Sequence, residues 1–392
     1  MTRFTGVALC ATMALSSSAA TAAVETVLYS FPQDAEPLSR LEQLKSGALH
    51  GTTYSGYGFG TVFELSERQG VWRVRTINQF SGSNGRSPIA GVTHDPDDVL
   101  WGTTMLGGTH NFGTIYSLTP NGADWTPNLL YSFSGSADGK WPQGNLARDS
   151  VTGTFYGTTS SSGTYNCGTA FQISPQKAVS TLYTFHGASD GCNPKTAMHS
   201  GAQSGTLLGS TYYGGRGNAG TIFQLAEVNG VWTESVLYAF TNGIDGGYPT
   251  DITVDNNGNV VGVTQSGGAS GHGVLFKVSQ ESGGRGWHES VLYNFNGTPD
   301  GNWPVGLAPG DKSRTYYITT RKGGSRNRGG VFKYTSTGGI GQETTLYSFG
   351  SAAGDGASPQ SRVNIEPETG LIYGTTSIGG QFGGGTVYQI SE

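Results

Sequence analysis

Charged side chains are scarce in this chain, at 12% of its 392 residues, which is about half of ordinary usage. The formal net charge is only −5, and a mildly acidic surface argues against nucleic acid as a partner, because phosphate binding requires a dense basic face. Glycine is abundant instead, with 65 residues. Such a composition could indicate disorder, but the 11% of aromatic residues recur at regular intervals and therefore predict a packed β structure.

Long apolar runs are missing as well. The run Phe4–Leu15 is too short to cross a bilayer, and small residues follow it up to Ala23. We therefore expect residues 1–23 to be a secretory signal peptide cleaved near Ala22 or Ala23, and the mature protein to be secreted or periplasmic, without a membrane span. Cleavage would remove Arg3 and no acid, so the net charge of −5 becomes −6.

Cysteine is nearly absent, with three residues. Cys10 lies in the expected leader, where a lipoprotein anchor is the alternative, although the bulky Leu9 before it argues against that type of cleavage. The remaining Cys167 and Cys192 form an even pair. In an oxidising compartment we expect them to form one disulfide.

The mature chain shows no sustained 3.6-residue apolar period, so helices should be nearly absent. Short signatures bounded by glycine recur instead, about every fifty residues. The first ends in phenylalanine, at Phe31, Phe80, Phe133, Phe185, Phe240, Phe295 and Phe349. The second is Gly-Thr-Thr or a variant of it, starting at Gly51, Gly102, Gly157, Gly209, Gly262, Ile318 and Gly374. The third is Gly-Thr-apolar-aromatic, ending at Phe63, Tyr116, Phe171, Phe223, Phe276, Phe332 and Tyr388.

A fourth strand candidate follows a proline between the first and second signatures, as in Asp251 to Val254 and Val305 to Ala308. Four strands per repeat are the content of one propeller blade. We therefore predict an all-β fold in which residues 24–392 form a single seven-bladed β-propeller of four-stranded blades. The strand 25–31 has no preceding partners, so we expect it to complete the C-terminal blade and close the ring, which removes two exposed edges. An open β-solenoid is the alternative.

The repeat also resembles a known family. The run Leu346-Tyr347-Ser348-Phe349, then Asp355-Gly356-Ala357-Ser358-Pro359, Leu371 to Thr376, Gly379-Gly380 and Gly385-Thr386-Val387-Tyr388 is similar to the tandem repeat of the secreted bacterial GloVer (Gloeobacter/Verrucomicrobia) family. The resemblance covers essentially all of the mature chain. It implies an extracellular repeat protein and transfers no catalytic residues. The first repeat departs most, with Asp34-Ala35-Glu36-Pro37 in place of the usual Asp-Gly or Asn-Gly.

Residues that recur in blade after blade are expected to serve the fold. The loop aspartates precede glycine and should close turns: Asp138, Asp190, Asp245, Asp300 and Asp355. Four tryptophans stand eight residues before a closing phenylalanine and should pack beside it: Trp72, Trp125, Trp232 and Trp287. Asparagines two residues before the third signature should adopt left-handed turns: Asn111, Asn166, Asn218 and Asn327.

The loop between the second and third strands of each blade, which we call the interior loop, and the loop that leads to the next blade should emerge on one face of the ring. A disulfide between Cys167 and Cys192 requires that arrangement. This loop face collects basic and aromatic residues that are not repeated. The ligand-binding candidates are Arg86, Lys140, Trp141, His186, Tyr248, Trp303 and Arg328. The candidates for catalysis are His110, His272, Tyr165, Arg216 and Arg326, if their side chains converge.

Aromatic faces stack on sugars and guanidinium groups pair with carboxylates, so an extracellular polysaccharide is the expected ligand. A polysaccharide lyase acting on uronates by β-elimination is one alternative, and a scaffold that binds a cell-surface protein is another. Hydrolysis by paired carboxylates is less favoured, because the acids of the loop face are mostly repeated turn residues. We expect no cofactor and no transition-metal site, and the sequence leaves a structural calcium ion open. The protein should be a monomer.

Overall fold

The computed structural model describes residues 23–281, 283–284 and 286–392. The expected signal peptide and Cys10 lie outside these residues, except for Ala23. Strands make up nearly all regular structure, with one 3-10 turn, η1 (Gly56–Gly58). Within the described ranges, no helix is long and apolar enough to cross a membrane.

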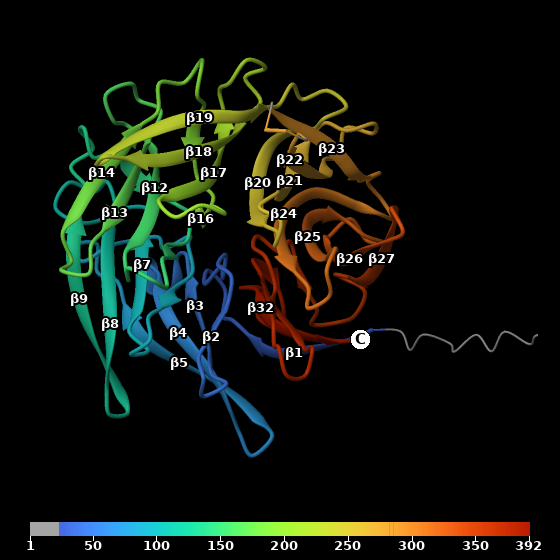
Figure 1. Cartoon of the computed structure of the whole chain (residues 1–392). Coiled ribbons are helices and arrows are strands. Elements are labelled where there is room, and N and C mark those ends of the chain that lie inside the picture. Colours follow the sequence, from blue (N-terminus) through green and yellow to red (C-terminus); the bar gives the residue numbers. More distant parts are fainter. Residues whose placement is uncertain (1–22, 282, 285) are drawn as a thin grey trace, which may run out of the picture.

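Seven four-stranded antiparallel blades surround a centre, as Figure 1 shows, and this confirms the predicted propeller. The innermost strands are β2 (Glu42–Gln43), β6 (Thr93–His94), β10 (Lys140–Pro142) with β11 (Ala147–Arg148), β15 (Cys192–Pro194) with β16 (His199–Ser200), β20 (Gly247–Val254), β24 (Gly301–Pro309), and β28 (Gly356–Ala357) with β29 (Asn364–Ile365). The second strands are β3 (Leu49–Thr53), β7 (Leu100–Thr104), β12 (Phe155–Ser161), β17 (Thr206–Tyr213), β21 (Val260–Ser266), β25 (Thr315–Gly323), and β30 (Ile372–Thr376) with β31 (Ile378–Gly379).

The outer half of each blade holds its third and outermost strands. The third strands are β4 (Thr61–Arg68), β8 (Thr114–Asn121), β13 (Thr169–Ile173), β18 (Thr221–Val228), β22 (Val274–Gln280), β26 (Gly330–Thr337) and β32 (Thr386–Ser391). The outermost are β5 (Val71–Gln79), β9 (Asp124–Ser132), β14 (Val179–Thr184), β19 (Val231–Ala239), β23 (Trp287–Asn294), β27 (Ile340–Ser348) and β1 (Val24–Ser30). We number the blades 1 to 7 from β2.

The first strand closes the ring. β1 pairs antiparallel with β32, with Val24 opposite Ser391 and Ser30 opposite Thr386. In Figure 1 the blue β1 accordingly lies beside the red β32. The last blade therefore takes its outermost strand from the start of the described chain, as the order of the signatures predicts.

Aromatic pairs join each blade to the next. The closing phenylalanine of one outer strand meets the aromatic ring of the following blade's third strand edge-on: Phe31–Phe63, Phe80–Tyr116, Phe133–Phe171, Phe185–Phe223, Phe240–Phe276, Phe295–Phe332 and Phe349–Tyr388. Rings in this geometry attract each other beyond the benefit of burial. Every member of these pairs is buried. The first and third signatures are thus the two halves of one contact between blades.

The second signature supplies the space for that ring. A Cβ atom on Gly51 would lie 2.6 Å from Cζ of Phe63 and 3.0 Å from Cδ2 of Leu41. Blade 6 has Ile318 at this position, and there the two ring centroids are 6.2 Å apart, against 4.9–5.3 Å in the other blades. The glycine is therefore conserved between blades for close packing, and the isoleucine displaces the ring.

The repeated polar residues lie in turns. Each loop aspartate accepts a hydrogen bond from the hydroxyl of a tyrosine in the preceding outer strand, in the pairs Tyr131–Asp138, Tyr183–Asp190, Tyr238–Asp245, Tyr293–Asp300 and Tyr347–Asp355. Backbone amides also donate to these carboxylates, as from Thr241 to Asp245 at 2.8 Å. Asn111, Asn166, Asn218 and Asn327 all have positive φ. The four tryptophans pack against the clusters of buried apolar residues.

Four glutamates of the outer strands face these aspartates across the blade boundaries, in the pairs Glu25–Asp355, Glu234–Asp190, Glu289–Asp245 and Glu343–Asp300. Burial and the neighbouring aspartate raise the pKa of Glu234 to about 8. The same causes raise the pKa values of Glu25 and Glu289 to about 7. These glutamates therefore hold protons in the folded state at pH values where the unfolded chain has released them.

We predict that Gly51→Ala lowers the free energy of unfolding by about 1–3 kcal/mol, because the added methyl group would overlap with the ring of Phe63. Urea denaturation measures the change. Combining the variant with Phe63→Leu, which lacks the ring atom in contact, should cost less than the sum of the two single changes. Strict additivity of the two costs would contradict the proposed contact.

We also predict a pH-dependent effect of Glu234→Gln. A raised pKa means that the folded state binds the extra proton, so this glutamate destabilises the fold progressively as pH rises from about 4.5 to about 8. The variant should match the wild type near pH 5 and exceed it in stability near pH 9. Denaturation curves at both pH values test this. Glu227→Gln, at an exposed position, is the control and should show no such trend.

Candidate functional site

A cavity of about 250 Å³ lies at the centre of the ring. Its lining comes mainly from the residues that directly follow the repeated proline of each innermost strand, among them Gln143, Lys195, Asp251 and Gln360. Because each blade contributes the same segment, the backbone around the cavity repeats while the side chains vary. The site thus combines a regular frame with an irregular chemical surface.

One ion pair crosses the cavity lining. Nη2 of Arg362 lies 2.7 Å from Oδ1 of Asp251, and the backbone amide of Leu307 donates to Oδ2 of the same carboxylate at 2.9 Å. Burial raises the pKa of Asp251, while Arg362 and two backbone amides oppose that rise. This pair links blades 5, 6 and 7, and the carboxylate cancels the charge of Arg362.

Arg40 is a second cation of the lining. Its Nη2 lies 3.4 Å from Oε2 of Glu42, and Glu42 is also 2.8 Å from Nδ1 of His94. The hydrogen bond with Glu42 raises the pKa of His94. Nε of Arg40 is buried and has no hydrogen-bond partner in the described chain. The guanidinium is therefore only partly satisfied by the protein.

Two further cations, Lys195 and Arg321, line the cavity close to aromatic rings. Nζ of Lys195 lies 3.2 Å above the ring of Tyr212, whose hydroxyl donates to Oε1 of Gln265 at 2.6 Å. Burial lowers the pKa of Lys195 to about 8. The guanidinium carbon of Arg321 is 5.8 Å from the ring of Trp303. Among the described residues, neither cation forms an ion pair with an acid.

A ring of seven residues stands at the loop-face end of the innermost strands, each directly before the repeated proline: Glu36, Ser87, Trp141, Asn193, Tyr248, Trp303 and Ser358. We call them the pre-proline ring. All seven have positive φ, from 50 to 61°, and each donates its backbone N–H to a carbonyl of the preceding blade. Positive φ is uncommon for bulky residues, so the fold imposes this conformation on each blade.

Three members of the pre-proline ring are aromatic and half-buried, namely Trp141, Tyr248 and Trp303. Nζ of Lys140 lies 4.5 Å from the ring of Trp141, and Nζ of Lys322 lies 4.1 Å from that of Trp303. Tyr248 instead packs beside Tyr212 and Tyr213. Trp141, Tyr248 and Trp303 thus share one repeat position, directly before the proline that leads into the cavity lining, and Trp303 itself lines the cavity.

The other binding candidates lie apart from the cavity lining. Arg86 pairs through its backbone with Leu106, and its Nε is buried without a partner in the described chain. Nδ1 of His186 is 2.8 Å from Oδ2 of Asp190. Arg328 is exposed, and its aliphatic stem covers Gly350. Their role in binding stays a prediction.

The five catalytic candidates come from the interior loops of blades 2 to 6. His110, Arg216 and Arg326 are exposed, and the ring of Tyr165 lies 4.2 Å from that of His186. His272 covers Gly297, much as Phe112 covers Gly135 in the corresponding place of blade 2. In the described part of the chain, no hydrogen bond, aromatic contact or cation–π contact joins any two of the five. Their convergence stays a prediction.

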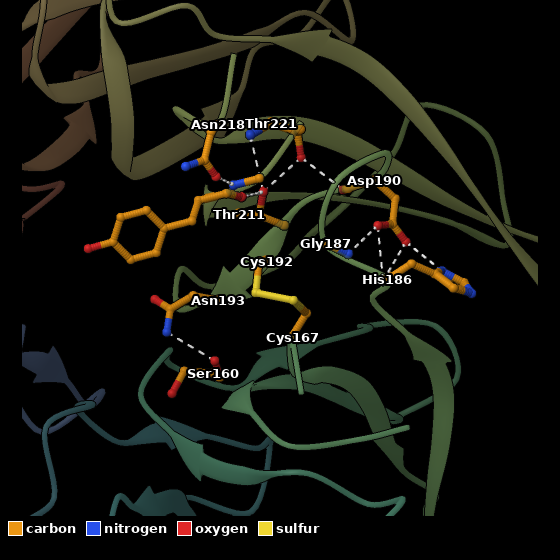
Figure 2. The surroundings of a disulfide bond; sticks show 12 residues. Ser160, Cys167, His186, Gly187, Asp190, Cys192, Asn193, Thr211, Asn218 and Thr221 are labelled. Atoms are coloured by element: carbon orange, nitrogen blue, oxygen red, sulfur yellow. Dashed lines mark hydrogen bonds and ion pairs between the residues drawn. A yellow bond between two sulfur atoms is a disulfide. The ribbon is translucent and has the colours of Figure 1, made fainter. Parts of the chain in front are cut away.

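The disulfide between Cys167 and Cys192 links the interior loop of blade 3 to the start of blade 4 (Figure 2). The Cα atoms are 4.4 Å apart. Directly beside the bridge, the N–H of Asn193 donates to the carbonyl of Cys167 at 2.9 Å, and Nδ2 of Asn193 donates to the carbonyl of Ser160. The bridge therefore reinforces the hydrogen bond that every blade makes at the pre-proline ring.

Sequence reasoning missed most of the cavity lining, including Arg40, Lys195, Arg321 and Arg362. A signal exists for Arg40, Lys195 and Arg362, which lie one to three residues after the repeated proline of their blades, where charge differs from blade to blade. Arg321 lies in the second strand β25 and has no such signal. In the described part of the chain, no three side chains of His, Cys, Asp or Glu gather to hold a metal ion.

Comparison with known proteins supports the propeller fold and identifies the family. A hypothetical selenium-binding protein from Sulfolobus tokodaii is similar with a TM-score of 0.57 and 8% identity, over 76% of this chain and 74% of that one. A putative 6-phosphogluconolactonase from Bacteroides uniformis is similar with a TM-score of 0.53 and 11% identity, over 82% of this chain and 85% of that one. At such identities the likeness shows the propeller fold alone.

The sequence matches no curated protein. The Gloeobacter/Verrucomicrobia repeat, in contrast, matches it twice, over residues 14–152 and 128–286, which together span well over half of the chain. Those residues hold earlier copies of the repeated signatures, whereas the run from which we inferred the resemblance, Leu346 to Tyr388, lies beyond them. The chain belongs to the Gloeobacter/Verrucomicrobia repeat family.

Proposed function

We propose that this protein is exported and binds an extracellular polysaccharide at the loop-face mouth of its central cavity. One observation carries the proposal: at the repeat position that the fold holds in a left-handed conformation, blade 6 places an aromatic side chain, Trp303, against a polar cavity. Trp303 belongs to both the pre-proline ring and the cavity lining. Rigid aromatic faces with fixed polar neighbours are the usual means of holding a sugar ring.

The cavity lining offers suitable hydrogen-bonding groups. Gln143, Asn145, Gln265 and Gln360 carry amides that can both donate to and accept from sugar hydroxyls. At about 250 Å³ the cavity is slightly smaller than the roughly 300–1,000 Å³ typical of pockets for drug-sized ligands. It therefore suits one sugar residue rather than a stretch of polymer.

The lyase and the protein scaffold remain the alternatives. A lyase requires a base and a cation that meet at one uronate, and the described contacts do not bring His110, Tyr165 or His272 to such a cation. A scaffold would use the exposed outer surface of the loop face rather than the cavity. Both alternatives predict results that differ from those of a glycan-binding site.

We predict that the purified protein is retarded on affinity gels that contain its polysaccharide, and that Trp303→Ala and Tyr248→Ala each weaken binding about fivefold, because one lost aromatic contact costs on the order of 1 kcal/mol. Tyr57→Ala removes an aromatic side chain that is 72% exposed on an interior loop and is the matched control.

Retardation by a broad polysaccharide panel that none of the three variants alters would place binding elsewhere. Formation of an unsaturated uronide, followed by ultraviolet absorbance, would support the lyase instead. Failure to bind any polysaccharide would favour the scaffold.

A further inference from the structure

We propose that the cavity is specific for an acidic sugar, whose carboxylate is bound by Lys195 and Arg321 while its ring packs on Trp303. This inference rests on the proposed polysaccharide binding and names the class of sugar. Its basis is the distribution of charge within the cavity, which differs from that of the protein as a whole.

The cavity lining is cationic although the chain is acidic. Four cationic side chains line it, Arg40, Lys195, Arg321 and Arg362, against the single carboxylate of Asp251. The whole chain, in contrast, has a formal net charge of −5. Cations gathered in a partly enclosed site repel one another, and an anionic ligand relieves that cost.

Arg40 and Arg362, each three residues after the repeated proline of its blade, already have an acidic partner. Arg362 pairs with Asp251 at 2.7 Å, and Arg40 lies 3.4 Å from Glu42. Within the described residues, Lys195 and Arg321 have no acidic partner. Their charged groups instead lie over the aromatic rings of Tyr212 and Trp303. The two cations beside the aromatic residues are thus the ones available to a ligand.

The chemistry of these groups fits a uronate better than a neutral sugar. A guanidinium can bind a carboxylate through two parallel hydrogen bonds, and an ammonium adds a third charge-assisted bond. A uronate carries its carboxylate on the edge of the pyranose ring, so the ring face remains free to stack on Trp303. A single sugar residue can thereby contact both the two cations and the aromatic ring of Trp303.

The test compares uronate oligosaccharides, of galacturonate, glucuronate and mannuronate, with the same oligosaccharides after reduction of the carboxyl to an alcohol. Titration calorimetry of the full chain should show at least one uronate binding tenfold or more tightly than its reduced form, since a hydrogen bond to a charged group contributes more than one to a neutral group. Lys195→Met and Arg321→Met should each remove most of this preference.

Matched controls separate the carboxylate site from general charge and from folding. Lys322→Met removes a cation that also lies against Trp303, at 4.1 Å, but does not line the cavity, and it should retain the preference. Lys195→Arg keeps the charge and should retain most of it. Unchanged thermal unfolding of all four variants shows that the fold is intact.

The outcomes distinguish the two proposals. Equal affinity for a uronate and its reduced form, or tight binding of sulfated oligosaccharides alone, overturns the carboxylate site and leaves polysaccharide binding standing. A preference for uronates that survives both Lys195→Met and Arg321→Met overturns the assignment of these residues. Absence of binding to every oligosaccharide and polymer overturns the proposed function itself.

Discussion

The edge-on contact between two aromatic rings at each blade boundary is the interaction on which the rest of this structure depends. It joins the end of one outer strand to the third strand of the next blade, and it repeats around the whole ring. The rings can approach only because a glycine in the second strand leaves room beneath one of them, as Gly51 does for Phe63. Two of the three repeated signatures therefore encode a contact, and the remaining one encodes the space for it.

This outer packing leaves the centre of the ring free to vary. In five of the seven blades the innermost strand is reduced to segments of two or three residues, and hydrogen bonds between blades hold the backbone at the pre-proline ring regardless of the side chain. Trp303 and Ser358 occupy the same backbone conformation in adjacent blades. The chemistry of the cavity can thus differ from blade to blade within one repeated backbone frame.

The sequence predicted the fold in detail because the fold depends on repeated residues. Period, strand number and closure by residues 25–31 all follow from three signatures and their order. The site was predicted only in part. Trp141, Tyr248 and Trp303 stood out as aromatic, but Lys195 and Arg321 have meaning only once the blades form a ring, since they come from different blades and no local pattern links them. The catalytic candidates share a loop type, which does not establish that their side chains meet.

The pairing of β1 with β32 has a consequence for the order in which the molecule can form. Val24 lies opposite Ser391, so β1 finds its partner only after the residues of all seven blades between them have been made. Until then the remaining blades form an open arc with an unpaired strand at each end, which is the kind of edge through which β proteins aggregate. Contacts so distant in sequence form slowly. The pairing of β1 with β32 that completes the ring is therefore also the step of assembly at which aggregation can most easily compete.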